Sequence, residues 1–391
     1  MSLSLFKKKN SYETLLLVDL RSASVGASLI LFSETEKPRI VYTVRKNILF
    51  KDPLEADVFI DTMFKTLREV LTEAHSSGIR KLAEHKADIP SHIQVVYSSP
   101  WFTSTIKEMN LKQDKPFNFT QDYFAKLIKQ QATPPETGVL IEKDITRVVI
   151  NGYEITNPFN KKVNEILFSM YLSTISKESK HSVEETIQNI FHIKNITHRT
   201  FPLITFTTLR NLFVNISSFI FIDIGGEVSD IGIVENNNLT HTVSMPNGYS
   251  TFIRTLMSEF KCSNFEAVSY IENYDFTNAT ALSADKRQIF ERLMKDWVQT
   301  FSQTMSESAL IFPRNIFISV HKPYANFFAQ IFKENLFDTD NDPKTLSINL
   351  ALLDHILLND HLVYDSDVIK DAPMELETVF LETALKSDYN R

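Results

Sequence analysis

Residues 221–234, FIDIGGEVSDIGIV, constrain the fold more than any other part of the chain. Two apolar runs rich in β-branched residues flank the pair Gly225-Gly226, which predicts two buried strands joined by a tight turn. The chain contains only 8 glycines in 391 residues, about a third of average usage. Glycines kept at this turn indicate either a tight turn alone, which we favour, or a backbone that approaches a ligand closely.

A second hairpin of the same kind lies near the start of the chain. VDLRSASVGASL carries Asp19 at the end of its first strand, as IDIGGEVSDIGI carries Asp223. Each hairpin leads into a third apolar strand, and helical periodicity follows, at residues 54–75 and 284–310. A further strand comes next in each half, at 93–100 and in NIFISV. This order predicts a duplicated α/β fold with mixed sheets.

The segment between the two halves predicts an additional small α+β unit. FTQDYFAKLIKQQ has the spacing of an amphipathic helix with Thr120 as its N-cap. The pair Asn151-Gly152 between apolar runs is typical of a β-hairpin, and VNEILFSMYLST is expected to be a strand. Ser182 followed by Glu185 predicts a capping box at the start of the next helix.

The composition excludes several classes of protein. The net charge of -7 argues against a general nucleic-acid binder. The single cysteine, Cys262, cannot form an internal disulfide, so we expect an intracellular protein. No apolar run approaches the ~18–20 residues that span a bilayer. Lys7, Lys8 and Lys9 are expected to be a solvated start, with a weak contact to an anionic membrane as the alternative.

Taken together, the two hairpins and the intervening unit resemble the actin-like ATPase superfamily, and in particular the cell-division protein FtsA and the type IV pilus protein PilM. NGYEITNPFNKKVNEILFSMYL and HTVSMPNGYSTFIRTLMSEF are similar to segments of that family. The resemblance implies a duplicated actin-like (RNase H-like) fold with an inserted FtsA-type domain. The expected parts are the first domain in 1–87 and 181–212, the insert in 88–180, the second domain in 213–345, and a C-terminal return segment with a terminal helix in 346–391.

In that family the two hairpins hold the phosphates of ATP from opposite sides of a cleft. The resemblance therefore implies that Asp19 and Asp223 would bind Mg²⁺ if the metal binds at all. Backbone N–H groups hold phosphate where glycine allows a close approach. If ATP binds, the residues implied for it are Asp19, Ser22, Asp223, Gly225, Gly226, Ser229 and Asp230.

The sequence departs from the family pattern at every part of this site. Arg21 replaces the glycine that follows the first Asp-hydrophobic pair, and it supplies a cation to phosphate, fills the slot or faces solvent. Glu227 would repel phosphate. Val268 and Ile271 replace residues that contact ribose, and His321 is expected to be a turn residue. These changes predict no cofactor, or weak binding of ATP with Mg²⁺. Other catalytic motifs are absent from the sequence.

We therefore expect a scaffold protein of a cell-division or type IV pilus machine that acts by binding partners or by polymerising. The alternative is an active magnesium-dependent ATPase with a remodelled cleft. Expected partners are the cytoplasmic tail of a membrane protein or a tubulin-like filament, with self-association possible and nucleic acid excluded. The expected location is the cytoplasm, at the inner face of the membrane. The acidic face of the terminal segment, with Glu375, Glu377 and Glu382, favours a packed helix over a membrane anchor.

Overall fold

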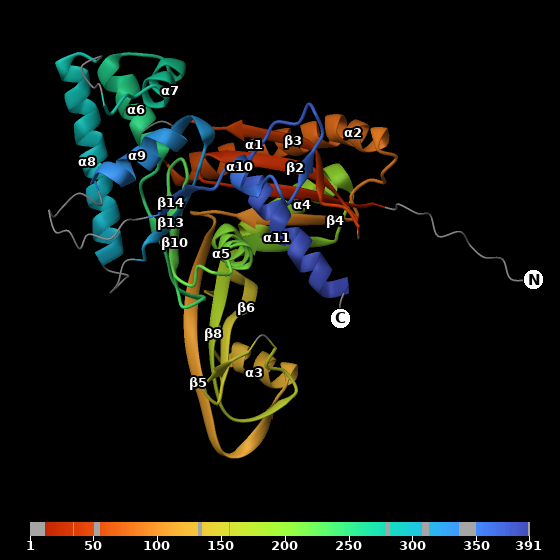
Figure 1. The fold of residues 1–391 in the computed structure, drawn as a ribbon. Coiled ribbons are helices and arrows are strands. Elements are labelled where there is room, and N and C mark those ends of the chain that lie inside the picture. Colours follow the sequence, from red (N-terminus) through yellow and green to blue (C-terminus); the bar gives the residue numbers. More distant parts are fainter. Residues whose placement is uncertain are drawn as a thin grey trace, which may run out of the picture.

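The chain folds around three β-sheets, two of which form matching halves while the third projects from them (Figure 1). The computed structural model describes residues 12–33, 35–50, 55–131, 135–155, 157–277, 282–306, 313–335 and 349–389. The cluster Lys7 to Lys9 lies outside these residues. No helix in the described part of the chain is long and apolar enough to cross a membrane.

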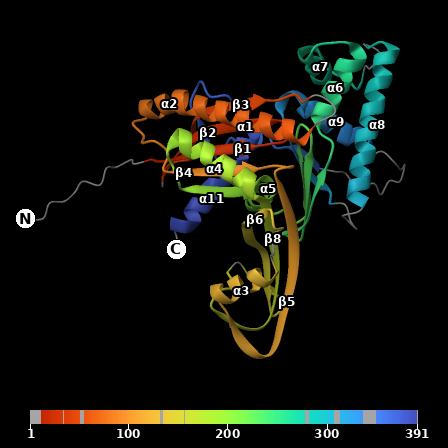
Figure 2. The same ribbon diagram turned by 180° about the vertical axis from the view of Figure 1, so that it is seen from behind.

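The first half is a six-stranded sheet covered by helices on both faces. Its strand order is β15-β3-β2-β1-β4-β9, with bounds β1 Glu13–Leu20, β2 Ser24–Phe32, β3 Arg39–Asn47, β4 His92–Tyr97, β9 Ile196–Thr200 and β15 Val363–Tyr364. One face packs on α1 (Ala56–Glu73) and α4 (Lys177–Phe191), which Figure 2 shows in front of the sheet. The other face packs on α5 (Phe201–Leu212) and α11 (Ala372–Tyr389). A π-helical turn, Ala74–Gly78, joins α1 to α2 (Ile79–Glu84).

The second half is a five-stranded sheet in the order β12-β11-β10-β13-β14. The strands are β10 Phe219–Ile224, β11 Ser229–Glu235, β12 Asn238–Met245, β13 Asn315–Val320 and β14 Asn349–Leu352. An aromatic-rich core centred on Trp297 fills the space between one face and its helices. Those helices are α6 Tyr249–Phe260, α7 Asn264–Glu272, α8 Ala284–Ser306 and α9 Ala325–Asn335, the last preceded by the 3₁₀ turn Lys322–Tyr324. The short α10 (His355–Leu358) follows β14.

The two halves repeat one plan, which confirms the predicted duplication. In each half a three-stranded antiparallel meander is followed, after helical segments, by a strand that pairs in parallel with the first strand of the meander. The inner faces of both sheets share a single core with α5 and α11, so the two halves are packed together. Because Asp19 and Asp223 end equivalent strands, the repeat brings both carboxylates to the line between the halves.

The third sheet is the inserted unit, with the order β5-β8-β6-β7. Its strands are β5 Phe102–Phe119, β6 Gly138–Ile150, β7 Tyr153–Glu154 and β8 Lys161–Ser176, and α3 (Gln121–Gln131) covers one face. Asn151 and Gly152 both have positive φ, as the predicted β6–β7 hairpin requires. The hydroxyl of Thr120 accepts a hydrogen bond from the backbone N–H of Tyr123, as expected of an N-cap.

Three expectations need correction. The strand at His92–Tyr97, placed in the insert from the sequence, pairs with β1 and β9 in the first sheet, so the inserted sheet begins at Phe102. Helix α4 begins at Lys177 with Ser176 as its N-cap, because the helical pattern extends further back than the Ser182–Glu185 signal. Glu375 and Glu377 are buried, so α11 has no acidic outer face at these positions, although it packs on the protein as predicted.

Candidate functional site between the two halves

The candidate site lies where the β1–β2 turn meets the β10–β11 turn. Asp19 pairs with Gly26 and lies at the carboxyl end of β1, beside β4. Asp223 pairs with Asp230 at the carboxyl end of β10, beside β13. The carboxyl ends of such parallel strands are where α/β proteins bind ligands. Both aspartates are almost fully buried, so their charges need partners within the protein.

The guanidinium of Arg21 supplies that partner to both halves at once. Its Nε donates to Asp19 Oδ2 at 2.7 Å, and its Nη1 donates to Asp223 Oδ1 and Oδ2 at 2.8 and 2.7 Å. Arg21 is buried, so these are charge-assisted hydrogen bonds in a low-dielectric surrounding. A cation from the chain itself thus lies between the two carboxylates that were expected to hold Mg²⁺.

Neighbouring groups fix Arg21 in this orientation. Its guanidinium carbon lies 4.3 Å from the ring centroid of Phe201, a cation–π distance. Trp101 Nε1 donates to the backbone carbonyl of Arg21 at 3.1 Å. The backbone N–H of Arg21 donates to the carbonyl of Ser24 at 3.0 Å, which closes the turn. Hydrogen bonds therefore fix the backbone of Arg21, and the Phe201 ring packs against its guanidinium.

A second arginine extends the network to the C-terminal segment. Arg45 Nη2 donates to Asp19 Oδ2 at 2.6 Å, and Arg45 Nε donates to Asp371 Oδ2 at 2.5 Å. Burial alone would raise the pKa of Asp371, but Arg45 outweighs it and holds that pKa below its usual range. In the same segment, DSDVIKDAP, Asp371 is largely buried, and Asp365 pairs with Arg39 and His85.

Glu377 on α11 lies close to this network without a hydrogen-bond partner in the described part of the chain. Burial raises the pKa of its carboxyl well above the usual range, and the Asp19 carboxylate raises it further, against the opposing effect of Arg21. The two arginines are paired with the carboxylates of Asp19, Asp223 and Asp371.

The Ser22 side chain forms hydrogen bonds with backbone N–H groups of the second turn. Its hydroxyl oxygen accepts hydrogen bonds from the backbone N–H of Glu227 at 3.0 Å and of Val228 at 3.4 Å. Backbone N–H groups in such a turn are the donors that hold phosphate oxygens in phosphate-binding loops. Ser22 Oγ thus takes the role that a phosphate oxygen would have, and it comes from the opposite half of the protein.

The glycines of the second turn leave room for this contact between the halves, because a Cβ at either position would meet the first turn. A Cβ on Gly226 would lie 2.2 Å from Ala23 Cβ, and one on Gly225 would lie 2.9 Å from Ser22 Oγ. A Cβ on Gly248, which precedes α6, would lie 2.2 and 2.3 Å from the carbonyl oxygens of Gly225 and Gly226. The two turns therefore pack so closely that no side chain fits between them at Gly226. A Cβ on Gly225 would also lie 2.4 Å from the carbonyl oxygen of Val228 in its own turn, so the predicted tight turn accounts for Gly225 in part, and the contact with the first half adds to it.

The remaining acidic and hydroxyl groups of the second turn have partners of their own. Glu227 Oε1 accepts from Arg254 at 2.7 Å, so the residue expected to repel phosphate is neutralised. Ser229 Oγ donates to the carbonyl of Asn247 at 2.7 Å. Asp230 accepts hydrogen bonds from the N–H and hydroxyl of Ser99 and from the hydroxyl of Ser244. Burial raises the pKa of Asp230 in spite of these bonds.

The positions that would meet a nucleoside form part of the protein core. Ile271 is buried, and Val268 packs against the same core of the second half. The ring of Tyr249 stacks on that of Tyr324 at 4.4 Å. His321 follows β13 and precedes the 3₁₀ turn, as predicted for a turn residue, and burial lowers its pKa.

These residues do not fit ATP with Mg²⁺ in the arrangement described. Arg21 lies between the two aspartates, Ser22 accepts from the turn N–H groups, and Ala23 packs where a phosphate would approach Gly226. Of the residues that the resemblance implied, Asp19, Ser22, Asp223, Gly225 and Gly226 come together, but Asp19 and Asp223 bind Arg21, and Ser22 binds N–H groups of the second turn. Ser229 and Asp230 face other partners. In the described ranges, no group of three or more His, Cys, Asp or Glu side chains is arranged to hold a metal ion.

The site includes residues that sequence reasoning missed. Arg45, Asp371 and Glu377 reach Asp19 or Arg21 from strands and helices distant in the chain. Arg45 lies in a strand of alternating pattern, where an arginine indicates a solvent-facing position. For Glu377 the sequence contains one sign of burial, because the residue lies between the apolar residues Leu376 and Val379 of the terminal helix.

A second buried carboxylate joins the insert to the first half. Glu142 on β6 accepts from the N–H and hydroxyl of Thr200, at 3.0 and 2.6 Å, and from the hydroxyl of Ser173 at 2.5 Å. Burial raises the pKa of Glu142 to about 7 from 4.5, against the lowering effect of the hydrogen bonds from Ser173 and Thr200. The folded state therefore binds this proton more tightly than the unfolded state.

Because of this difference, Glu142 should make the folded chain less stable as the pH rises. Its contribution is fully present below about pH 4.5 and is lost by about pH 7, a change on the order of 3 kcal/mol. The variant Glu142→Gln, which keeps the shape, should lack this component. We expect the unfolding free energy of the wild type to fall relative to the variant over this range in urea titrations. Parallel pH profiles would contradict the assignment.

Comparisons with known proteins show that the chain is similar in fold to solved structures. No protein-family model matches the sequence, and no curated protein matches it. A solved structure described as the PilM-PilN type IV pilus biogenesis complex contains a similar chain, with a TM-score of 0.57 and 10% sequence identity over 95% of this chain and 98% of that one.

Two further structures resemble the chain less well. The ethanolamine utilization protein EutJ from Carboxydothermus hydrogenoformans has a TM-score of 0.45 and 11% identity, and covers 95% of this chain and 89% of its own. A Bacteroides thetaiotaomicron protein with an actin-like ATPase fold and unknown function has a TM-score of 0.38 and 11% identity, over 94% and 95% of the two chains. With its duplicated sheets and its insert, the chain has the actin-like ATPase fold.

Proposed function

We propose that this chain is a binding scaffold on an actin-like fold, whose nucleotide cleft is filled by its own side chains. The observation that carries the proposal is the Arg21 guanidinium between Asp19 and Asp223. A guanidinium there neutralises both carboxylates and ties the two halves together, which is the role a bound metal and nucleotide would otherwise have. The chain then keeps one closed arrangement without a ligand.

The proposed role is partner binding in a type IV pilus or cell-division machine. The similar solved chain comes from a complex of PilM with PilN, which supports a protein partner for this chain. The proposed partner is the cytoplasmic tail of a membrane protein, which would recruit the chain to the inner face of the membrane. A tubulin-like filament is the alternative partner. An active magnesium-dependent ATPase would require Arg21 and Ser22 to leave the positions described here.

Binding of Mn²⁺ alone tests the filled cleft. Mn²⁺ is a paramagnetic substitute for Mg²⁺, and the free ion can be followed by electron paramagnetic resonance. We expect no stoichiometric site in the wild type below millimolar Mn²⁺, because the cation position is taken. The variant Arg21→Ser should gain a site, since it removes the cation that Asp19 and Asp223 share. A tight site in the wild type that disappears in Asp223→Asn would overturn the proposal.

A further inference from the structure

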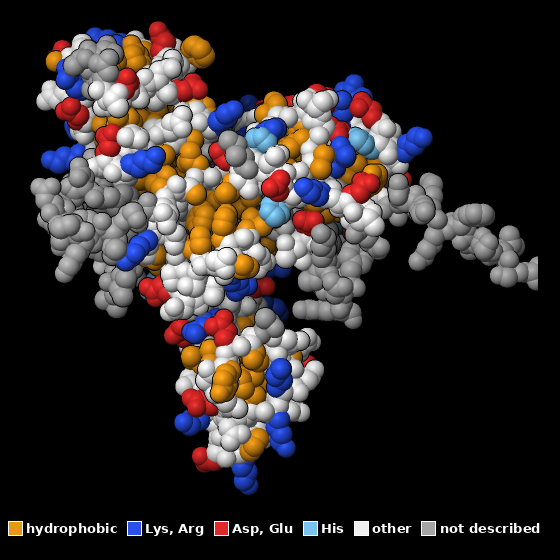
Figure 3. Space-filling model, viewed as in Figure 1, with side chains coloured by type: hydrophobic (Ala, Val, Ile, Leu, Met, Phe, Trp, Pro, Cys, Tyr) orange, Lys and Arg blue, Asp and Glu red, His pale blue; other side chains and the backbone are white. Residues whose placement is uncertain are grey.

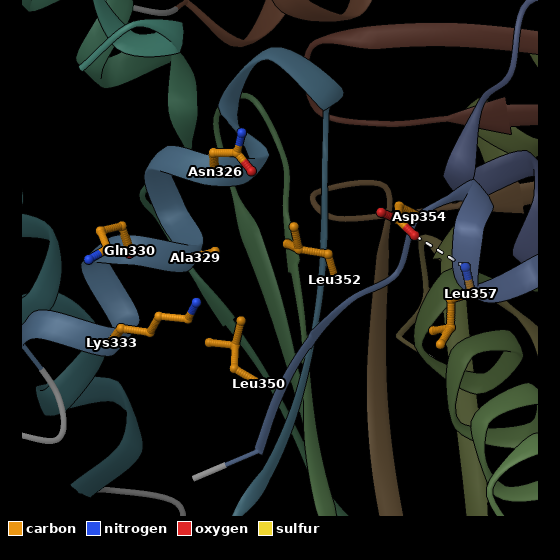
Figure 4. Close-up of a pocket in the computed structure, with 8 residues that line it drawn as sticks. All are labelled: Asn326, Ala329, Gln330, Lys333, Leu350, Leu352, Asp354 and Leu357. Carbon is orange, nitrogen blue, oxygen red and sulfur yellow. Dashed lines mark hydrogen bonds between the residues drawn. The ribbon is translucent and has the colours of Figure 1, made fainter. Parts of the chain in front are cut away.

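A groove lies in the second half, away from the filled cleft. It has a volume of about 590 Å³ and lies between α9 and α10, with β14 between them (Figure 4). Its apolar lining comes from Ala329, Leu350, Leu352 and Leu357, and Figure 3 shows hydrophobic side chains gathered on this face of the molecule. Asn326, Gln330, Lys333 and Asp354 supply its polar rim.

The strand beside the groove is the last of its sheet among the described residues. β14 runs parallel to β13, and the N–H groups of Asn349 and Leu353 donate to carbonyls on the β13 side, at 3.0 and 2.7 Å. Because backbone groups alternate along a strand, those of Leu350 and Leu352 point away from β13. An edge of this kind is a template for one more strand.

The rim carries one charged side chain of each sign, Lys333 and Asp354, and Asp354 already accepts a hydrogen bond from the backbone N–H of Leu357. Lys333 is exposed on α9 and reaches the groove beside Leu350 (Figure 4). An ammonium group at the rim of an apolar groove favours a carboxylate on the bound segment. The side chains of Leu350 and Leu352 lie on the same face of β14, so an added strand would present its own apolar residues at alternate positions.

We propose that this groove binds an extended peptide of a partner protein, which adds to the edge of β14 as a sixth strand. The peptide carries two apolar side chains two positions apart and a carboxylate that pairs with Lys333. The proposal rests on the proposed function in taking the chain as a partner-binding protein. It does not depend on the state of the cleft, because none of the lining residues contacts Arg21, Asp19 or Asp223.

The test is selection from a phage library of random twelve-residue peptides against the full wild-type chain. We expect enriched peptides to share alternating apolar residues and an acidic residue. Synthetic copies should bind Leu352→Pro about tenfold more weakly, since proline removes the outward N–H and leaves the bonds to β13 intact. Leu352→Val, which keeps that N–H and most of the apolar side chain, should bind the peptides more tightly than Leu352→Pro does.

Charge variants give an independent measure. Lys333→Glu should weaken the same peptides several-fold, and Lys295→Glu, an exposed lysine on α8, should not. Thermal unfolding of each variant verifies its fold. The proposal is overturned if no such peptide is enriched, or if binding is insensitive to Leu352→Pro and Lys333→Glu. It is also overturned if the wild type dimerises in sedimentation equilibrium and Leu352→Pro abolishes the dimer, because the edge then binds a second copy. None of these outcomes bears on the nucleotide and metal tests.

Discussion

Replacing Arg21 with methionine is expected to lower the free energy of unfolding by about 3–5 kcal/mol. The substitution keeps most of the apolar stem but removes the cation between two buried carboxylates. Asp19 would keep Arg45, whereas Asp223 would keep only a 3.5 Å contact with the hydroxyl of Ser98. A buried carboxylate left without its partner accounts for the size of the effect. Urea unfolding of the full chain at neutral pH measures it.

Two further variants identify the cause of that loss. Arg292→Met removes an arginine from an exposed ion pair with Glu259 and should cost less than about 1 kcal/mol. Adding Asp223→Asn to Arg21→Met should restore part of the lost stability, because the unpaired charge is gone. If the Arg21 variant is no less stable than the Arg292 control, the bridge between the halves does not have the strength inferred here.

The second large effect is expected at Gly226, where alanine should lower the unfolding free energy by about 1–3 kcal/mol. The added Cβ would lie 2.2 Å from Ala23 Cβ and 3.0 Å from Ser250 Oγ. The Ala23 Cβ is fixed to the backbone of the first turn, so relief requires the two turns to separate. Denaturant unfolding of the single variant gives the cost.

A compensating substitution shows whether the contact between the turns is responsible. Ala23→Gly removes the methyl group that the new Cβ would meet, so the double variant Ala23→Gly with Gly226→Ala should recover most of the loss beyond the effect of Ala23→Gly alone. Such a cycle isolates the pairwise term for residues in direct contact. Additive losses would mean that Gly226 is required for its own backbone and not for packing against the first half.

Much of the fold could be predicted from the sequence because the elements carry strong local signals. The β10–β11 hairpin, the amphipathic α8 and the Asn151-Gly152 turn follow from periodicity and turn chemistry within a few residues. The assignment of β4 to the first sheet could not be predicted in this way. Its apolar pattern indicates that the strand is buried, but it does not indicate which strand it pairs with.

The candidate site was predictable in its location and not in its contacts. Asp19 and Asp223 were found because each ends a buried strand of a repeated hairpin. For Arg21 the sequence left open whether the side chain fills the slot, binds phosphate or faces solvent, and only the distance to Asp223 on the other half decides this. Arg45, Asp371 and Glu377 belong to segments that meet only in the folded chain, so no spacing rule connects them.

The measurement that tests the central claim most directly is calorimetric titration of the full chain with ATP and Mg²⁺. The filled cleft predicts no saturable heat up to millimolar ATP, because Arg21, Ser22 and Ala23 occupy the positions of metal and phosphate. The double variant Arg21→Gly with Glu227→Gly, verified as folded, is expected to gain affinity. Saturable binding to the wild type at micromolar ATP, lost in Asp223→Ala, would contradict the claim that the chain fills its own nucleotide cleft.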